Sequence, residues 1–166
     1  QTGLHEEHLL EEIHKTPLET PIETDKVVPI AMVAENSPLR RLFCILFATE
    51  NGVISGVESA QVKEKLSSLL GSEFESLSEG YKKDRDKLIF EVELVYGSTI
   101  ALPEIEELAV NLEEDILRSR LLQKMVELQR AELAKQDKEV NILLKECQTI
   151  TERLSKIKNI VVESII

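Results

Sequence analysis

Cysteine and aromatic residues are scarce in this chain, and their scarcity excludes several classes of protein. Of its 166 residues, 4% are aromatic and none is tryptophan. Leucine, isoleucine, valine and alanine must therefore fill the core, as is common in helical bundles. Two cysteines, Cys44 and Cys147, cannot form a disulfide framework or a zinc site made of cysteine alone. Both fall on apolar positions of expected helices, so we expect buried free thiols, which suit a reducing compartment.

Long hydrophobic runs and an excess of basic residues are also absent. No apolar stretch approaches the roughly 20 residues that a membrane span needs, and the first residues lack the pattern of a secretory signal. We therefore expect a cytoplasmic protein with no membrane partner. The chain has 20 Lys and Arg against 31 Asp and Glu, a net charge of −11. Such a surface repels phosphates, so we expect no direct binding to duplex nucleic acid.

Recognisable catalytic motifs are missing as well. Neither Gly52 nor Gly56 is followed by Lys-Ser/Thr at phosphate-loop spacing, and no Gly-x-Ser-x-Gly elbow is present. Carboxylates cluster within Glu104–Glu107 and Glu113–Asp115. The positive end of a helix dipole explains acidic residues in the first turns better than acid/base chemistry does. We expect no catalytic residue, no cofactor and no enzymatic activity in this chain.

A group of histidines near the start of the chain invites a metal interpretation. His5, His8 and Glu12 would share one face of a short helix, and His14 follows. Metal sites of this kind need a rigid scaffold and further ligands, whereas these residues precede a proline-punctuated stretch. We therefore predict that no metal is bound here.

The chain divides into three parts by composition. Residues 1–36 are acidic and interrupted by Pro17, Pro21 and Pro29, so we expect a flexible linker or the end of a preceding domain, with a short helix at Leu4–His14. Residues 37–102 are expected to form a small helical bundle. Residues 103–166 are expected to form a long helical hairpin, which makes the predicted fold all-α.

The bundle is predicted from three segments. Ser37-Pro38 begins a helix that is apolar nearly all round and therefore central, and Asn51-Gly52 ends it. A second helix fits Val57–Leu70, and Tyr81–Tyr96 fits either a helix or a strand. We choose a helix there, because a lone strand would have no partner. The residues expected to face inward from the second helix are Ala60, Leu66, Leu69 and Leu70.

The hairpin is predicted from two apolar stripes separated by a polar turn at Lys135–Lys138. The second stripe has alternating spacings of three and four residues, which places its members on one side of a helix. The first stripe consists of Ile105, Leu108, Leu112, Ile116, Leu121, Met125 and Leu128. The second consists of Val140, Leu143, Cys147, Ile150, Leu154, Ile157 and Val161, and a further apolar tail runs from Ile160 to Ile166.

The stretches Leu121–Ala134 and Glu139–Leu154, with the polar turn between them, resemble the C-terminal helicase-binding domain of bacterial DnaG-type primases. The resemblance covers about the last 60 residues. It implies a helical subdomain joined by a long helix to a terminal hairpin, which engages the N-terminal domains of the hexameric DnaB-type helicase. The zinc-binding and RNA-polymerising domains of that family would precede this region.

From this resemblance we expect a protein-interaction domain that recruits primer synthesis to the replication fork, as a monomer or weak dimer. The alternative is a self-associating coiled-coil adaptor, because the stripes are equally compatible with pairing between chains. If the stripes pair within one chain, recognition must use other residues. We then expect the partner to bind Gln136 and Asp137 at the turn and Ile142 and Leu144 beside the inner stripe. Which face of the hairpin binds stays open at this point.

Overall fold

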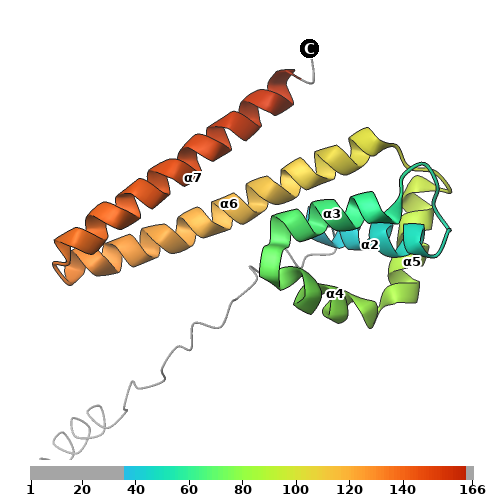
Figure 1. The fold of residues 1–166 in the computed structure, drawn as a ribbon, viewed down its shortest axis with the longest axis horizontal. Coiled ribbons are helices and arrows are strands. Elements are labelled where there is room, and N and C mark those ends of the chain that lie inside the picture. The colour runs from blue at the N-terminus through green and yellow to red at the C-terminus, as the bar shows by residue number, and fades with distance from the viewer. Residues whose placement is uncertain (1–35, 164–166) are drawn as a thin grey trace, which may run out of the picture.

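The structure, a computed structural model, describes residues 36–163, with side chains up to Asn159. Within this range the chain is almost wholly helical, and Ser55 and Thr99 form an isolated β-bridge. The predicted all-α fold, a small bundle joined to a long antiparallel hairpin, is confirmed (Figure 1). The helices are α2 (Pro38–Glu50), α3 (Ser59–Leu70), the 3-10 turn η1 (Gly71–Glu73), α4 (Phe74–Lys82), α5 (Arg85–Tyr96), α6 (Leu102–Leu133) and α7 (Asp137–Glu163).

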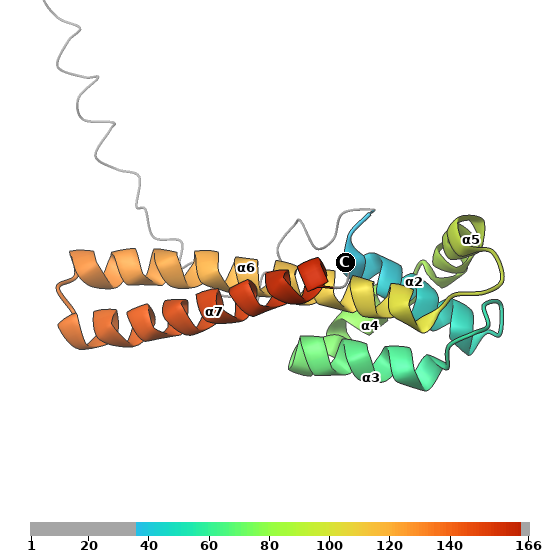
Figure 2. The same cartoon turned by 90° about the horizontal axis from the view of Figure 1, so that it is seen from above.

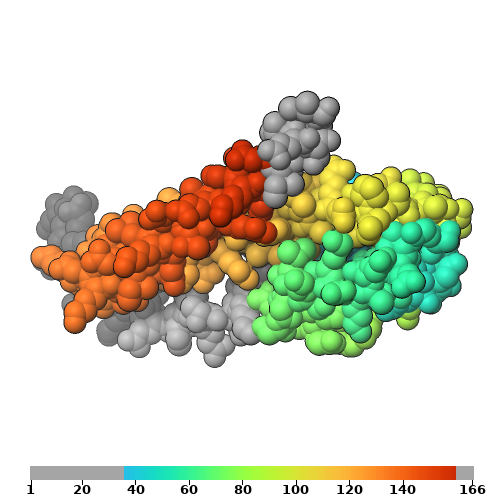
Figure 3. Space-filling view, turned by 45° about the horizontal axis from the view of Figure 1, so that its top comes forward, coloured from blue at the N-terminus to red at the C-terminus, as the bar shows by residue number. Residues whose placement is uncertain are grey.

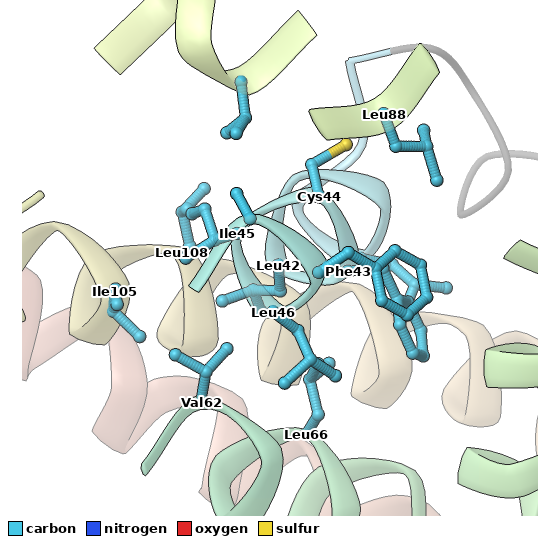
Figure 4. Packing of buried hydrophobic residues seen from close by; sticks show 14 of the residues in the cluster. Leu42, Phe43, Cys44, Ile45, Leu46, Val62, Leu66, Leu88, Ile105 and Leu108 are labelled. Carbon is cyan, nitrogen blue, oxygen red and sulfur yellow. The ribbon is translucent and has the colours of Figure 1, made fainter. Parts of the chain in front are cut away.

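Helix α2 is the centre of the bundle, as its apolar sequence predicts. The Ser37 hydroxyl accepts a hydrogen bond from the Arg40 N–H and so caps the helix start, and Pro38 occupies the first turn. Helices α3, α5 and α6 each pack against α2 (Figure 4). All apolar side chains from Leu42 to Ala48 are buried. The surrounding helices contribute Val62, Leu66, Leu88, Val92, Ile105, Leu108 and Leu112 to the same core.

Helix α4 was not predicted as a separate element. Its sequence contains three residues of low helix propensity, Ser76, Ser78 and Gly80, yet Phe74, Leu77 and Tyr81 recur at helical spacing. Phe74 and Tyr81 stack against Phe43 of α2, with ring centroids 6.0 and 4.8 Å apart. Burial of these rings against α2 stabilises a helix that its local sequence would not hold.

Two of the sequence predictions about inward-facing residues are wrong. Ala60 is exposed, whereas Val62 is fully buried. Residues two positions apart on a helix point about 200° apart, so a helix that buries Val62 must expose Ala60. Met125 is 54% exposed and does not belong to the inner stripe of the hairpin. The helical alternative for Tyr81–Tyr96 is confirmed, because α5 covers its greater part.

The hairpin extends from one end of the bundle (Figure 2). Helix α6 is continuous over 32 residues, packing on α2 and α3 near its start and against α7 beyond. Leu143 and Ile157 of α7 are 5% and 2% exposed, whereas Val140, Cys147, Ile150 and Leu154 are partly buried. Ion pairs between Arg153 and Glu113 (2.7 Å) and between Lys124 and Glu146 (3.0 Å) join the two helices. The predicted pairing of the two stripes within one chain is therefore correct.

The turn between α6 and α7 has a defined geometry. The Gln136 N–H donates to the Ala131 carbonyl and the Lys135 N–H to the Glu132 carbonyl, both at 3.0 Å. This pair of bonds is the Schellman arrangement that ends many helices. It requires a left-handed backbone at Lys135, which has φ 56° although it is not glycine. The turn is thus tight, and α7 begins at Asp137, two residues beyond Lys135.

Residues 1–35 and 164–166 lie outside the described residues, together with the side chains of 160–163. The expected helix at Leu4–His14, the histidine group and the apolar tail therefore stay predictions. No helix of the described part of the chain is long and apolar enough to cross a membrane.

Candidate protein-docking surface

The two apolar residues predicted to bind a partner on α7 do not lie together. Ile142 and Leu144 are 59% and 47% exposed, on either side of the buried Leu143. Each lies about 100° from Leu143 around the helix, in opposite directions. They therefore face opposite flanks of the hairpin, and a single flat partner surface cannot contact both of them.

The two residues predicted at the turn are exposed. The backbone of Gln136 is engaged, because its N–H bonds to Ala131 and its carbonyl accepts from the Val140 N–H. Asp137 is the first residue of α7, where a carboxylate interacts favourably with the helix dipole, and its carbonyl accepts a hydrogen bond from the Asn141 side chain. Both side chains therefore stand at the tip of the hairpin, beside residues that hold the turn.

A larger apolar surface lies on the side of α6 that faces away from α7. Lys124 of α6 reaches across to Glu146 of α7, so the side of α6 that carries Lys124 faces α7. Leu122 and Val126 are two residues before and after Lys124 and point to the opposite side. Leu133 follows the buried Ala131 by two residues and therefore points to the side of the helix opposite Ala131. Leu122, Val126 and Leu133, which we call the outer α6 stripe, are 66%, 47% and 80% exposed.

The outer α6 stripe is part of an uncharged row of residues that runs over four turns of helix. Ser119, Leu122, Val126, Gln129 and Leu133 follow one another at spacings of three and four residues. That alternation keeps all five on one side of the helix. Charged side chains occupy its borders, and Met125 (54% exposed) lies along one of them. An uncharged apolar strip with polar borders is the pattern of a protein-binding surface.

Sequence reasoning missed this stripe because it assigned the apolar residues of α6 to a single face. The signal was present in two adjacent apolar pairs, Leu121-Leu122 and Met125-Val126. Neighbouring residues point about 100° apart, so the members of such a pair cannot both face the centre of one interface. Helix α6 in fact has an inner face toward α7 and an apolar outer face.

The inner face of the hairpin is fixed by charged groups as well as by apolar packing. Lys124 Nζ lies 2.9 Å from Glu127 and 3.0 Å from Glu146. The hydrogen bonds to Glu127 and Glu146 raise the pKa of Lys124, and the bond to Lys124 lowers the pKa of Glu127. These exposed pairs favour one register of α6 against α7 and contribute modestly to stability.

The carboxylate clusters Glu104–Glu107 and Glu113–Asp115 have structural contacts. Glu104 accepts a hydrogen bond from the Ala101 N–H at the start of α6, at 3.2 Å. Glu113 pairs with Arg153 of α7, and Glu114 pairs with Arg118 one turn further along. Burial raises the pKa of Asp115, and the neighbouring Glu114 raises it further. Among residues 36–163, no group of three or more His, Cys, Asp or Glu side chains is placed to hold a metal ion.

Viewed as a solid surface, the hairpin projects well beyond the bundle (Figure 3). Side chains near its tip are therefore accessible to a partner that does not touch the bundle.

Comparison of the chain with protein-family models, with curated proteins and with solved structures found no match.

Proposed function

We propose that this chain is a protein-docking domain whose hairpin binds the N-terminal domains of a replicative DnaB-type helicase and thereby recruits primer synthesis to the replication fork. The resemblance of Leu121–Ala134 and Glu139–Leu154 to DnaG-type primases supplies the partner. The observation that most supports docking is the outer α6 stripe. Its three apolar side chains, Leu122, Val126 and Leu133, are exposed to water on a projecting helix.

The arrangement of the inner stripe supports docking over self-association. Leu143 and Ile157 are buried in the pairing of α7 with α6 of the same chain. The inner stripe is therefore not free to form a coiled coil with another copy. Binding to a ring of identical helicase subunits would raise the local concentration of primase by multivalency, so that modest affinity at each hairpin is sufficient.

The test is binding of the purified chain to hexameric helicases from a panel of bacteria, by fluorescence anisotropy. The informative variant is Val126→Glu, which places a charge in the middle of the outer α6 stripe. We expect its affinity to fall at least tenfold, about 1.4 kcal/mol, with unchanged circular dichroism. Ile142→Glu is the matched control, because Ile142 is similarly exposed but lies on α7.

Three results would count against the proposal. If the unmodified chain binds no replicative helicase, the assignment to the primase family is wrong. If Val126→Glu binds normally while Ile142→Glu does not, the partner uses α7 and not the outer α6 stripe. If the unmodified chain forms stable dimers that Val126→Glu dissociates, the stripe serves self-association, and the chain is an adaptor.

A further inference from the structure

The two long flanks of the hairpin, on which α6 and α7 are both exposed, differ in charge. Two ion pairs join the helices, Lys124 with Glu146 and Glu113 with Arg153. Around α7, Glu146 and Arg153 lie about 60° and 80° from the buried Leu143. Ile142 lies about 100° from Leu143 in the same direction. Both ion pairs are therefore on the flank that carries Ile142, which we call the charged flank.

Met125 of α6 lies on the opposite flank. Leu128 and Leu121 are partly buried and face α7. They lie about 40° and 60° around the helix from Lys124. Met125 lies about 100° from Lys124 in the same direction, so Lys124 and Met125 are at the two edges of the surface that faces α7. Because Lys124 is on the charged flank, Met125 is on the other one, where it is 54% exposed.

Leu144 of α7 lies on the same flank as Met125 and at a similar level along the hairpin. It faces the flank opposite to that of Ile142. Lys124 pairs with Glu146, which places these two residues level with each other. Met125 is one residue closer to the turn than Lys124. Leu144 is two residues closer to the turn than Glu146, so the two apolar side chains lie across from one another.

This side of the hairpin, which we call the uncharged flank, is continuous with the outer α6 stripe. Its residues come from both helices and none of them is charged: Leu121, Met125, Leu128, Val140, Leu144, Cys147 and Thr151. Met125 lies only about 60° around α6 from Leu122 and so borders the stripe. One uncharged surface therefore extends from the outer side of α6, past Met125, to Leu144 of α7.

An α-helix is the element of a partner that fits this surface. The backbone N–H and C=O groups of α6 and α7 are bonded within each helix, so the flank has no edge to which a strand could add. A helix satisfies its own backbone and can lay an apolar face along two antiparallel helices. From Val140 to Thr151 the flank measures about 16 Å, the length of about three helical turns.

The distribution of charge indicates which flank is used and that the helix belongs to another protein. A helix on the charged flank would have to remove water from the Lys124–Glu146 and Glu113–Arg153 pairs, which costs free energy. The uncharged flank imposes no such cost. Each copy of the chain carries a net charge of −11, so two copies repel one another.

We propose that the hairpin binds an amphipathic helix of another protein along the uncharged flank, with Met125 on one side of the bound helix and Leu144 on the other. The contacting face of that helix is apolar and uncharged, because the flank has no charged group to pair with one. If the partner is the helicase of the proposed function, on which this proposal rests, its bound element is such a helix. Ile142 then stays outside the interface.

The test compares Leu144→Glu with Ile142→Glu, its matched control. Both residues are apolar, about half exposed and on α7, but they face opposite flanks. Binding to purified hexameric helicases is measured by fluorescence anisotropy. We expect Leu144→Glu to weaken binding at least about tenfold and Ile142→Glu by less than about threefold, with unchanged circular dichroism for both. Leu144→Ala and Ile142→Ala should rank in the same order, so the result does not depend on how well a glutamate is tolerated.

Cys147 gives an independent readout, because it lies on the uncharged flank and is only partly buried. A helix bound along this flank should cover it. We therefore expect bound helicase to slow the alkylation of Cys147 in the unmodified chain.

Equal losses of affinity at Leu144 and Ile142, a larger loss at Ile142, or unchanged alkylation of Cys147 in the complex would overturn the proposal. If Val126→Glu weakens binding and Leu144→Glu does not, the proposed function stands and only the use of the uncharged flank is wrong. If the unmodified chain binds no helicase, the proposed function fails and this proposal fails with it. Stable dimers that Leu144→Glu dissociates would also overturn it, because a second copy would then occupy the flank.

Discussion

Leu108 and Val126 point to the same side of α6, because 18 residues correspond to about five complete helical turns. Leu108 is 8% exposed and packs in the bundle core, whereas Val126 is 47% exposed. One side of a single helix is thus a core surface in its first part and a free surface in its second. The apolar face of α6 continues past the last residues of the bundle that cover it.

This contrast predicts different responses to the same substitution. Leu108→Ala should lower the free energy of unfolding by about 2–5 kcal/mol, because it removes buried methyl groups from a packed core. Leu122→Ala, on the outer α6 stripe, should change it by about 0.5 kcal/mol or less, because Leu122 is 66% exposed. Chemical denaturation followed by circular dichroism measures both. A large loss at Leu122 would mean that the stripe is covered in the isolated protein.

The pairing of α7 with α6 is tested by two isoleucines of the same helix. Ile157 is 2% exposed and Ile142 is 59% exposed. Ile157→Ala should lower the free energy of unfolding by about 2–5 kcal/mol. Ile142→Ala should lower it by only about 0.5 kcal/mol or less. Thermal unfolding of the two variants gives the comparison directly. Similar transition temperatures for both would indicate that α7 does not pack on α6 through the predicted stripe.

The turn of the hairpin contains strain that glycine should relieve. Lys135 has φ 56°, a left-handed conformation that costs a residue with a Cβ roughly 1–2 kcal/mol. Lys135→Gly should therefore raise the free energy of unfolding by about 1 kcal/mol. Lys145→Gly, an exposed position in the middle of α7, should lower it by about 1 kcal/mol, because glycine is unfavourable there. If both variants are destabilised, the backbone at Lys135 is not left-handed.

Cys44 provides a prediction about pH. Burial raises the pKa of its thiol from 9.0 to about 11, with Glu91 adding to the effect and Arg40 opposing it. The protonated thiol is favoured in the folded state, so its contribution to stability is complete below about pH 9 and is lost as the pH rises toward 11. Stability should fall over this range by less in Cys44→Ala than in the unmodified chain.

The two cysteines should also differ in reactivity. When the folded protein is alkylated at pH 8, Cys147 should react before Cys44, because Cys147 is only partly buried and Cys44 is buried. Faster alkylation of Cys44 would contradict its burial.

The sequence was sufficient for features that rest on periodicity and on strong local signals. The boundaries at Ser37-Pro38 and at the Lys135 turn follow from capping chemistry and from the interruption of the apolar stripe. The candidate site depends more on tertiary structure. Ile142 and Leu144 lie off the inner stripe, but a one-dimensional pattern does not tell which flank of the hairpin each residue faces. The outer α6 stripe depends on where the bundle stops covering α6, which is a tertiary relationship.

Helix α4, in the bundle, is a second element that the local sequence does not predict without its tertiary contacts. Its serines and its glycine disfavour a helix, and its aromatic residues become informative only once Phe43 of α2 is known to lie beneath them. Ala60 and Val62 differ in burial for a similar reason, since either could face inward until the orientation of α3 on α2 is known.

Because α6 passes without interruption from the bundle into the hairpin, it sets the spacing between the two ends of the molecule. Its 32 residues measure about 48 Å at 1.5 Å per residue. To bring the hairpin tip closer to the bundle, the chain would have to break hydrogen bonds inside this helix. A molecule held at the tip is therefore kept at a set distance from the bundle, so α6 behaves as a rigid spacer and not as a flexible tether.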